Sequence, residues 1–373
     1  MKIGIIGGGI NGLMIALKLS KNGHKVTLFE KNKLLSGTSM ATSKLIHGGL
    51  RYLENFQFFF VKESLEEREW WLKKYPEHVH PIKIFLPIYQ ESSRNENIVS
   101  IGLKLYDFLF SSKVLPRSKK ENIDLISKKH AELNTQNLKS IHSYYDAMMD
   151  DIGLGNQLIN EAKDSEIELL ENSPVLAFKL DGSIDYLSFS KGEGAQKKST
   201  ETFDLLINAA GPWAKKILDD SSIATKYDLD LIRGSHILIS RSCEHSYILE
   251  IPNSKRIFFV LPFRSNTLIG TTEIEQSIDE PIVMENSEIE YLINSYNKYF
   301  SQPLNRTEIV GEYSGLRPLI SSDHDPVSKS RDFTFEKNQR VINVFGGKWT
   351  TSRLLASKLA KLVEKSSIES NGQ

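Results

Sequence analysis

The sequence opens with the feature that most restricts its fold, a glycine pattern placed between two apolar runs. The pattern is G-x-G-x-x-G, formed by Gly7, Gly9 and Gly12. Residues 2–6 (KIGII) before it are typical of a buried strand, and residues 13–20 after it have the apolar spacing of a helix. A second apolar run, 25–29, ends in Glu30. Together these segments predict the strand–turn–helix–strand unit that binds dinucleotides.

This unit also limits which dinucleotide can bind. The glycines allow a tight turn, the helix N-terminus faces the pyrophosphate, and the acid accepts hydrogen bonds from ribose hydroxyls. An acid at position 30 argues against a ribose 2′-phosphate, hence against NADP, and leaves NAD and FAD open. The following loop is rich in Ser and Thr and does not continue into another strand–helix unit. Its hydroxyls and amides favour a pyrophosphate and a flavin ring.

Composition limits the kind of protein that carries this unit. A chain of 373 residues exceeds the usual size of one hydrophobic core, so we expect two domains. Its 47 basic and 47 acidic residues balance, which argues against nucleic acid as a partner. The single cysteine, Cys243, excludes an internal disulfide and fits a reducing compartment. Without an apolar run of about 18 residues, we expect a cytoplasmic protein, at most peripheral at the inner face of the cytoplasmic membrane.

The stretch 39–54 (SMATSKLIHGGLRYLE) concentrates groups that suit a flat ligand and an anion. A glycine pair that begins at Gly48 lets the backbone approach a ring closely, because no Cβ intervenes. His47 supplies a titrating imidazole, and Arg51 with Tyr52 follows it. Taken alone, the stretch could also be a polar loop that leads into a surface helix.

The run 42–54 (TSKLIHGGLRYLE) resembles the flavin-dependent sn-glycerol-3-phosphate dehydrogenase family, within the wider group of D-amino-acid-oxidase-like flavoproteins. The resemblance covers nearly the whole chain and includes 208–213 (NAAGPW), which resembles the second flavin-contacting segment of that group. Two departures stand out. The first helix lacks the family's usual Asp and Arg-Gly, and the chain stops soon after 346–351 (GGKWTT), where family members carry a further C-terminal helical domain.

The resemblance implies bound FAD as the cofactor. The implied FAD contacts are Gly7, Gly9, Ile10, Asn11, Gly12, Glu30, Lys31, Thr38, Ser39, Thr42, Ser43, Lys44, Leu45, His47, Gly48, Val175, Ala210, Gly211, Trp213, Arg331, Gly347, Lys348, Trp349 and Thr350. We expect the FAD to be non-covalent, because no His or Cys stands in an obvious attachment context.

Cationic groups from distant stretches indicate a small phosphorylated substrate. Arg51, Arg317 and Lys348 each belong to a cofactor-shaped turn. Arginine forks bind phosphate oxygens in pairs and a lysine adds a point charge, which an uncharged sugar would not need. The resemblance implies that Arg317 contacts the substrate, while Tyr52 and Thr351 are predicted to orient it by hydrogen bonds. The alternative is a set of solvated surface cations.

The predicted reaction is FAD-dependent oxidation of sn-glycerol 3-phosphate to dihydroxyacetone phosphate, with hydride transfer from C2 to flavin N5. His47 or His236 is expected to take the C2 hydroxyl proton, since an imidazole of near-neutral pKa suits that step. With Arg317 they form the predicted catalytic set. His236 alone would equally fit a core histidine. Because arginines also bind carboxylates, an oxidase or dehydrogenase of a 2-hydroxy acid or an amino acid is the alternative, and a non-catalytic flavin-binding protein is a third.

Other expectations concern partners and metals. Quinone or oxygen is the expected electron acceptor. The amphipathic segment 101–117 either packs on the protein or touches a membrane surface, and packing is favoured. We expect no metal site, because His78 and His80 do not share a helix face and adjacent acids such as Asp150 and Asp151 point to opposite faces of a strand.

The predicted fold class combines α/β with antiparallel β structure: a Rossmann-type FAD-binding domain interleaved with a substrate domain on a mostly antiparallel sheet. From residue 231 onward, alternating strands with hairpins replace the earlier pattern. We predict a discontinuous FAD-binding domain of residues 1–80, 145–225 and 310–373, and a substrate domain of residues 81–144 and 226–309. Residues 190–201 are predicted to form a solvated hairpin turn.

Overall fold

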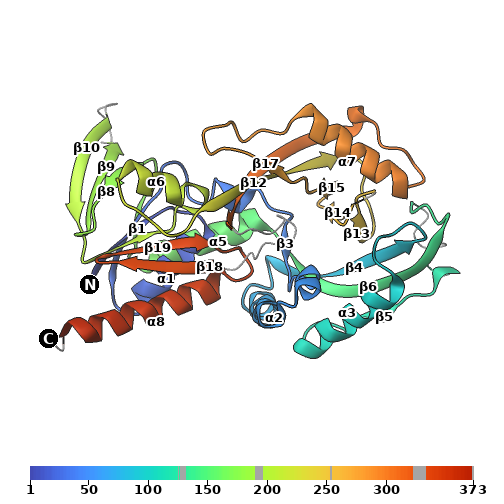
Figure 1. Cartoon of the computed structure of the whole chain (residues 1–373), viewed down its shortest axis with the longest axis horizontal. Helices are drawn as coiled ribbons and strands as arrows, with labels where there is room; N and C mark the ends of the chain where they lie inside the picture. The colour runs from blue at the N-terminus through green and yellow to red at the C-terminus, as the bar shows by residue number, and fades with distance from the viewer. Residues whose placement is uncertain (125, 127–131, 190–195, 253, 322–332, 372–373) are drawn as a thin grey trace.

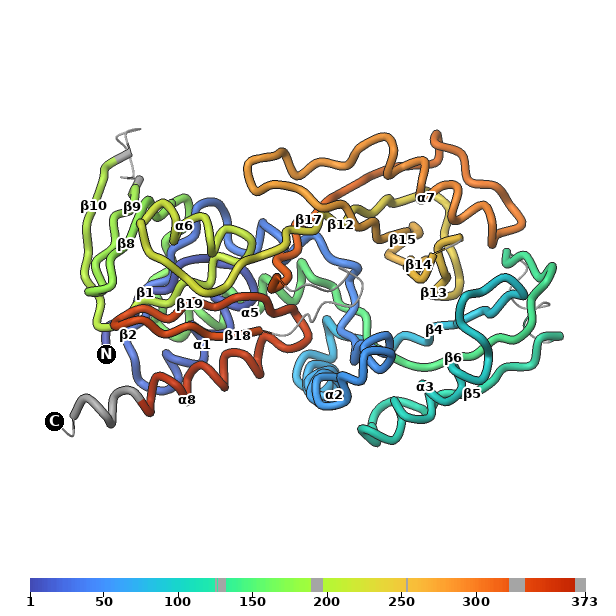
Figure 2. Tube along the Cα trace, in the orientation of Figure 1, coloured from blue at the N-terminus to red at the C-terminus, as the bar shows by residue number. Residues whose placement is uncertain are grey.

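The computed structural model describes residues 1–124, 126, 132–189, 196–252, 254–321 and 333–371. Its elements form two lobes side by side, one around a six-stranded sheet and one around a ten-stranded sheet (Figure 1). The N-terminus and the last helix lie in the first lobe, as the trace shows (Figure 2). This arrangement confirms the predicted fold class of a mostly parallel sheet joined to a mostly antiparallel one.

The six-stranded sheet has the order β18–β19–β11–β1–β2–β7. Its strands are β1 (Lys2–Ile6), β2 (Lys25–Phe29), β7 (Glu168–Leu170), β11 (Leu205–Asn208), β18 (Phe333–Asn338) and β19 (Val341–Gly346). Five of them pair in parallel, and β18 runs antiparallel to β19. The central strands are apolar and buried, because helices such as α1 (Ile10–Lys21), α5 (Asp151–Asp164) and α8 (Ser352–Asn371) cover the sheet.

The predicted strand–turn–helix–strand unit is confirmed at β1, α1 and β2. Leu13 and Ala16 of α1 are fully buried, as the apolar spacing predicted, whereas Leu17 is only partly buried. A Cβ at Gly12 would lie 1.9 Å from the carbonyl oxygen of Gly7, so only glycine lets the helix begin this close to the turn.

A small antiparallel sheet has the order β10–β9–β8 and corrects one prediction. Its strands are β8 (Val175–Phe178), β9 (Ser183–Phe189) and β10 (Gln196–Thr202). The predicted hairpin turn at 190–201 is therefore wrong over its second half, where β10 pairs with β9 along its whole length. The polar composition of this segment indicated solvent exposure but carried no information on backbone pairing, which any side chain at a sheet edge permits.

The ten-stranded sheet contains the remaining strands. They are β3 (Leu45–Ile46), β4 (Val79–Tyr89), β5 (Lys119–Lys120), β6 (Leu138–Met149), β12 (Leu229–Ile239), β13 (Ser246–Glu250), β14 (Ile257–Phe263), β15 (Asn266–Gly270), β16 (Ile274–Glu275) and β17 (Ile309–Ile320). The pairings are antiparallel except between β13 and β4. Strands β12 and β17 pair over their full lengths and reach toward the first lobe (Figure 1).

Helices cover both faces of this sheet. They are α2 (Phe58–Lys74), α3 (Glu96–Leu109) and α7 (Asn286–Tyr299). The shorter α6 (Ala214–Asp220) packs instead on β8 and β19 in the first lobe. The short 3₁₀ helices are η1 (Thr38–Met40), η2 (Leu50–Asn55), η3 (Gly211–Trp213) and η4 (Arg306–Glu308). The predicted amphipathic segment 101–117 belongs to α3 only as far as Leu109, and residues 110–117 lie beyond the helix. Its Leu103 and Tyr106 are buried against the protein, whereas Ile101 and Phe108 are exposed.

The chain passes repeatedly between the two sheets. It crosses between β2 and β3, between β6 and α5, between β11 and β12, and between β17 and β18. The predicted domain boundaries at residues 81, 145, 226 and 310 stay predictions. The crossings nevertheless bring turns from both sheets to one place, and a cavity of about 990 Å³ forms there.

Candidate active site

A cavity of about 990 Å³ lies where the two sheets meet. Its walls come from the turns that follow β1, β2, β11 and β19, together with residues of β12 and β17. The carboxyl ends of parallel strands are the usual place for a ligand in such sheets. The volume falls at the upper end of the range common for small-molecule sites.

Most of the sequence-predicted residues line this cavity. They are Gly7, Gly9, Ile10, Asn11, Glu30, Lys31, Thr38, Ser39, Thr42, Ser43, Leu45, His47, Arg51, Tyr52, Val175, Ala210, Gly211, Trp213, His236, Arg317, Gly347, Lys348, Trp349 and Thr350. Gly12, Lys44, Gly48 and Thr351 do not line it. Arg331 lies outside the residues that the structure describes.

The glycine turn leaves room for a ligand next to the start of α1. Gly7 has φ +103°, and a Cβ there would lie 2.6 Å from the carbonyl oxygen of Ala209. Gly9, Ile10 and Asn11 line the cavity at the helix N-terminus, where backbone N–H groups carry partial positive charge. Gly12 serves the packing of α1 on the turn and stands behind the cavity wall.

Glu30 is held at the edge of the cavity by two backbone groups. Its Oε2 accepts a hydrogen bond from the N–H of Gly8 at 2.7 Å, and its Oε1 accepts one from Asn32 at 2.9 Å. The carboxylate is therefore fixed where a ribose would follow a pyrophosphate on the glycine turn. Beside it, the Lys31 ammonium lies 3.4 Å from the centroid of the Trp213 ring. Burial lowers the pKa of Lys31.

The hydroxyl-rich loop connects the glycine turn to the last strands. The Oγ of Ser39 accepts a hydrogen bond from the N–H of Ile10 at 2.9 Å. The carbonyl of Ser39 accepts a hydrogen bond from the indole N–H of Trp349 at 2.7 Å. Thr38 donates its hydroxyl to the carbonyl of Leu316 at 2.8 Å. The loop thus joins β17 and the turn after β19 into one wall.

Lys44 points away from the cavity, into the protein. Its Nζ donates to a carboxylate oxygen of Asp151, the first residue of α5, and to the carbonyl of Met40 at 2.8 Å. Both side chains of the ion pair are almost fully buried. The backbone of Lys44 has φ +60°, a left-handed conformation that is uncommon for a residue other than glycine.

Gly48 contacts a buried polar cluster behind the cavity. A Cβ there would lie 2.3 Å from the hydroxyl of Tyr106. That hydroxyl donates to the Oδ1 of Asp146 at 2.8 Å, and Arg68 donates to the same oxygen at 2.6 Å. The pKa of Tyr106 is raised well above its ordinary value, mainly by burial. The cluster holds in place the turn that carries His47.

His236 is buried in the cavity wall and is held on two sides. Its Nε2 lies 2.9 Å from the Oγ of Ser43, and its ring stacks on Tyr313 with centroids 5.0 Å apart. Its Nδ1 is buried without a hydrogen-bond partner among the described residues. Burial first, then the charges of Arg317 and Lys44, lower the pKa of His236 to about 3, so the imidazole is neutral.

Arg317 projects from β17 toward the cavity and is oriented by two acceptors. Its Nη2 donates to the carbonyl of Thr272 at 2.8 Å, and its Nη1 lies 3.7 Å from Oε1 of Glu273. Gly234 on the paired strand β12 makes room for it, because a Cβ there would lie 2.7 Å from Nη2.

The other predicted cations enter the cavity from different elements, Lys348 from the turn after β19 and Arg51 from η2. The Lys348 ammonium lies 4.5 Å from the ring centroid of Phe60 and 5.3 Å from that of Tyr52. Aromatic faces attract a cation without cancelling its charge. Arg51 lines the same cavity and is half-buried. The structure therefore brings together three cations that are far apart in the sequence.

His47 lies close to the segment that contains Thr350 and Thr351. His47 lines the cavity, half-buried, and its backbone N–H donates to the Oγ1 of Thr350 at 3.2 Å. Thr351 follows behind the wall. Its Oγ1 is buried without a hydrogen-bond partner in the part of the chain that the structure describes.

Nearly the whole chain matches one known protein family. The model for FAD-dependent oxidoreductases of the DAO type matches residues 2–362, which contain both sheets and all the cavity walls. The chain belongs to this family. FAD is accordingly its cofactor, and the resemblance noted in the sequence is confirmed.

Two proteins of known name are similar in sequence to this FAD-dependent oxidoreductase. It is 36% identical to the aerobic glycerol-3-phosphate dehydrogenase of Escherichia coli (strain K12), over 94% of this chain and 71% of that protein. It is 32% identical to the D-erythritol 1-phosphate dehydrogenase of Brucella abortus (strain 2308), over 95% of this chain and 72% of that protein. Both relatives are longer than this chain.

Solved structures share the fold. The glycerol-3-phosphate dehydrogenase from Bacillus halodurans complexed with FAD aligns with a TM-score of 0.78 at 24% identity, covering 98% of this chain and 64% of that chain. A glycine oxidase from Bacillus cereus aligns with a TM-score of 0.74 at 17% identity, covering 98% of this chain and 95% of that chain. At these identities the likeness shows the fold alone.

The cavity of this FAD-dependent oxidoreductase fits its cofactor. Gly7 and Gly347 both have positive φ, and a Cβ would lie 2.6 Å from the carbonyl oxygen of Ala209 at Gly7 and 2.6 Å from the side-chain nitrogen of Asn11 at Gly347. The Oδ1 of Asn11 is buried without a hydrogen-bond partner among the described residues and belongs to the cavity lining. Glycine turns in the wall, an acid at one end and a helix N-terminus suit a dinucleotide.

Sequence reasoning missed several lining residues. Asp146, Glu273, Tyr313 and Ser314 all reach the cavity. The alternation of β6 places Asp146 on the face opposite Tyr145, a signal that was available in the sequence. Glu273 had no local signal, because its approach to Arg317 depends on strands far apart in the chain.

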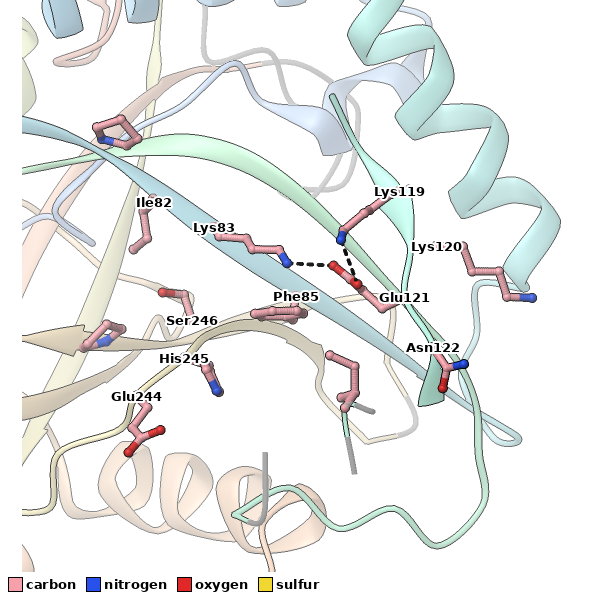
Figure 3. Close-up of a pocket in the computed structure, with 13 residues that line it drawn as sticks. Ile82, Lys83, Phe85, Lys119, Lys120, Glu121, Asn122, Glu244, His245 and Ser246 are labelled. Atoms are coloured by element: carbon pink, nitrogen blue, oxygen red, sulfur yellow. Dashed lines mark ion pairs between the residues drawn. The ribbon is translucent and has the colours of Figure 1, made fainter. Parts of the chain in front are cut away.

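A second cavity of about 690 Å³ lies on the ten-stranded sheet, away from these residues. Figure 3 shows Lys83 and Lys119 directed at Glu121, with Phe85 and His245 on the other side. The ammonium nitrogen of Lys83 lies 2.7 Å from one carboxylate oxygen of Glu121, and that of Lys119 lies 3.2 Å from the other. Lys83 and Lys119 thus share one carboxylate in the wall of this cavity, so their charge is partly compensated there.

Proposed function

We propose that this FAD-dependent oxidoreductase oxidises sn-glycerol 3-phosphate to dihydroxyacetone phosphate. One observation carries the proposal: Arg51, Arg317 and Lys348 line the same cavity as the glycine turn. Three cations beside a flavin site suit a phosphate dianion, which guanidinium forks bind in pairs. The names of the relatives, several of them glycerol-3-phosphate dehydrogenases at 30–36% identity, support the same substrate.

The cofactor would be held without a covalent bond along the cavity. The turn at Gly7 and the N-terminus of α1 would bind the pyrophosphate, and Glu30 the ribose. The turns at Ala210 and Gly347 would flank the ring system. Bound FAD would supply the acceptor for the hydride that leaves C2 of the substrate.

The chain's own residues would position the substrate and take its proton. Oxidation of the C2 alcohol releases a hydride from carbon and a proton from oxygen, and the proton passes to an imidazole. His47 lines the cavity directly after β3, and His236 lines it from β12. Burial is the main cause of the low pKa of His236, and phosphate bound at Arg317 would offset the smaller contribution of that arginine, which makes this imidazole a better base.

The test is an anaerobic titration of the FAD-loaded protein with sn-glycerol 3-phosphate. Loss of the oxidised flavin absorbance within the turnover time, with dihydroxyacetone phosphate as product, is the expected result. If 2-hydroxyglutarate or an amino acid bleaches the flavin and glycerol 3-phosphate does not, the proposed substrate is wrong and the compound that bleaches the flavin takes its place. An unchanged spectrum with every candidate would show a flavin-binding protein without turnover.

A longer polyol phosphate is the second candidate substrate. The 32% identity to a D-erythritol 1-phosphate dehydrogenase favours it, because that relative oxidises a phosphorylated polyol with one more carbon. Comparing kcat/KM for erythritol 1-phosphate and glycerol 3-phosphate under identical conditions decides between them.

The electron acceptor is proposed to be quinone or oxygen, with peripheral contact at the inner face of the cytoplasmic membrane. No helix among the described residues is long and apolar enough to cross a membrane. Phe56 and Phe59, before and in α2, are 79% and 87% exposed, and Ile101 and Phe108 are exposed on α3, which contacts α2. An exposed apolar surface of this kind suits a lipid interface.

The membrane contact is tested by sedimentation with phospholipid vesicles. Replacing Phe59 by Glu should reduce the bound fraction several-fold, whereas the same change at exposed Val310, on β17, should not. Equal binding of both variants would contradict the contact. Parallel measurement of oxygen uptake and quinone reduction identifies the acceptor.

A further inference from the structure

Glu273 is an acidic group at the substrate end of the cavity that the reaction does not explain. It follows β15 and lines the cavity, and its side chain is only 9% exposed. Its Oε1 lies 3.7 Å from Nη1 of Arg317, and its Oε2 lies 3.6 Å from Nε of Arg256. A carboxylate thus stands beside the arginine that is proposed to bind the phosphate.

The position of this carboxylate is fixed by the buried structure around it. The preceding residue, Thr272, holds Arg317 through its carbonyl at 2.8 Å and donates its hydroxyl to Glu288 at 2.6 Å. Glu288 also accepts from Ser235 at 2.8 Å and pairs with Arg233 at 2.9 Å. The backbone that carries Glu273 is therefore anchored to α7 and β12, so the carboxylate cannot withdraw easily when a ligand binds.

The remaining acids of the cavity lining are committed elsewhere. Glu30 accepts backbone hydrogen bonds at the nucleotide end. Asp146 pairs with Arg68 in the buried cluster, and Asp220 lies 3.7 Å from Lys216. Among the described lining residues, Glu273 is the acid that faces Arg317.

We propose that Glu273 is a specificity-determining residue that limits how much negative charge a ligand can bring to Arg317. The inference rests on the proposed function, in which Arg317 binds the substrate phosphate. A monophosphate whose other end is a neutral hydroxyl is accepted, because the three cations outweigh one carboxylate. A phosphate that also carries a carboxylate is rejected, because its second charge adds repulsion against a fixed, desolvated acid.

The experiment compares two small ligands that differ in this charge. The ligands are 2-hydroxyethyl phosphate and 2-phosphoglycolate, which share a two-carbon skeleton and end in a hydroxyl or a carboxylate. Their dissociation constants are measured at constant ionic strength from the perturbation of the flavin spectrum of the FAD-loaded protein. The wild-type chain should bind 2-hydroxyethyl phosphate more tightly, and the ratio of the two constants is the quantity followed.

Variants move this ratio in opposite directions. Glu273→Gln should reduce the ratio by about tenfold, because a neutral amide no longer repels the carboxylate. Glu273→Asp should keep most of it. Arg256→Gln should widen it, because the partly exposed Arg256 no longer offsets the charge of Glu273. Glu275→Gln, the same charge change at an exposed residue outside the cavity lining, is the matched control and should leave the ratio unchanged.

The outcomes separate this proposal from the proposed function. A wild-type ratio that Glu273→Gln does not change, or an Arg256→Gln variant with a smaller ratio, would overturn the role of Glu273. If glycerol 3-phosphate bleaches the wild-type flavin, that failure leaves the proposed function standing. If Glu273→Gln fails to retain FAD, Arg256→Gln decides the question alone.

Discussion

The Nε2 atom of His236 lies 2.9 Å from the Oγ atom of Ser43, although 193 residues separate them in the chain. The same imidazole stacks on Tyr313, whose hydroxyl donates to the carbonyl of Thr42 at 2.6 Å. Two strands of the ten-stranded sheet and the loop that flanks the cavity are thereby joined. A shift of His236 would move the loop, so substrate-side and cofactor-side geometry are coupled.

The buried His236 should make stability depend on pH. Its pKa in the folded protein is lowered to about 3, below the ordinary value of 6.5. As pH falls below 6.5, the unfolded chain binds a proton that the native imidazole does not, so native stability decreases. The His236→Asn variant should lose this component, which makes the slope shallower by up to about 1.4 kcal/mol per pH unit between these values. Urea unfolding at about pH 5 and about pH 7.5 measures it. The exposed His80→Asn variant should follow the wild type, and an equal slope in all three proteins would contradict the assignment.

Removing Arg317 should impair catalysis strongly and specifically. The Arg317→Ala variant should lower kcat/KM for glycerol 3-phosphate by about 10²- to 10³-fold, because charge-assisted hydrogen bonds to the phosphate are lost. Steady-state dye reduction measures the effect. Arg264→Ala, at a side chain 62% exposed, is the control and should keep wild-type kinetics. Full efficiency of Arg317→Ala would show that the phosphate binds elsewhere.

The buried ion pair between Lys44 and Asp151 should stabilise the folded protein, because each charge compensates the other. Lys44→Met should lower the free energy of unfolding by about 3–5 kcal/mol, since it leaves a buried carboxylate unpaired. The pKa of Asp151 is already raised by burial, with Lys44 acting in the opposite direction. The double variant Lys44→Met, Asp151→Asn should recover part of the loss in thermal unfolding. The exposed pair Lys215–Asp219 is the control, and its removal should change stability by less than about 1 kcal/mol. A double variant less stable than the single one would contradict the interpretation.

Gly12 should be irreplaceable even by alanine. A methyl group would lie 1.9 Å from the carbonyl oxygen of Gly7, so α1 would have to move off the turn. Gly12→Ala protein should lose bound FAD, read as the ratio of flavin to protein absorbance after purification. Gly102→Ala in α3, where a Cβ meets nothing within 4 Å, should keep its FAD and gain up to about 1 kcal/mol of stability. Normal flavin content in Gly12→Ala would mean that the turn tolerates the shift.

The sequence predicted those parts of the site whose contacts are local. The glycine turn, α1, β2 and Glu30 follow one another within thirty residues, and each has a recognisable pattern. The family resemblance extended this to Arg317 and Lys348, which the structure brings to the same cavity. Lys44 shows where a local pattern is insufficient. It lies within the resembling run, yet its side chain pairs with Asp151, 107 residues away.

Local patterns in the sequence therefore predict the cofactor unit and the fold class, because turn, helix and strand propensities act over short distances. The tertiary structure alone decided which charges share the cavity. Glu273 approaches Arg317 only because β12 pairs with both β15 and β17, and Asp146 is neutralised only because Arg68 of α2 packs behind it. Electrostatic interactions depend on distance in space and on burial, and neither quantity is encoded by the spacing of residues along the chain.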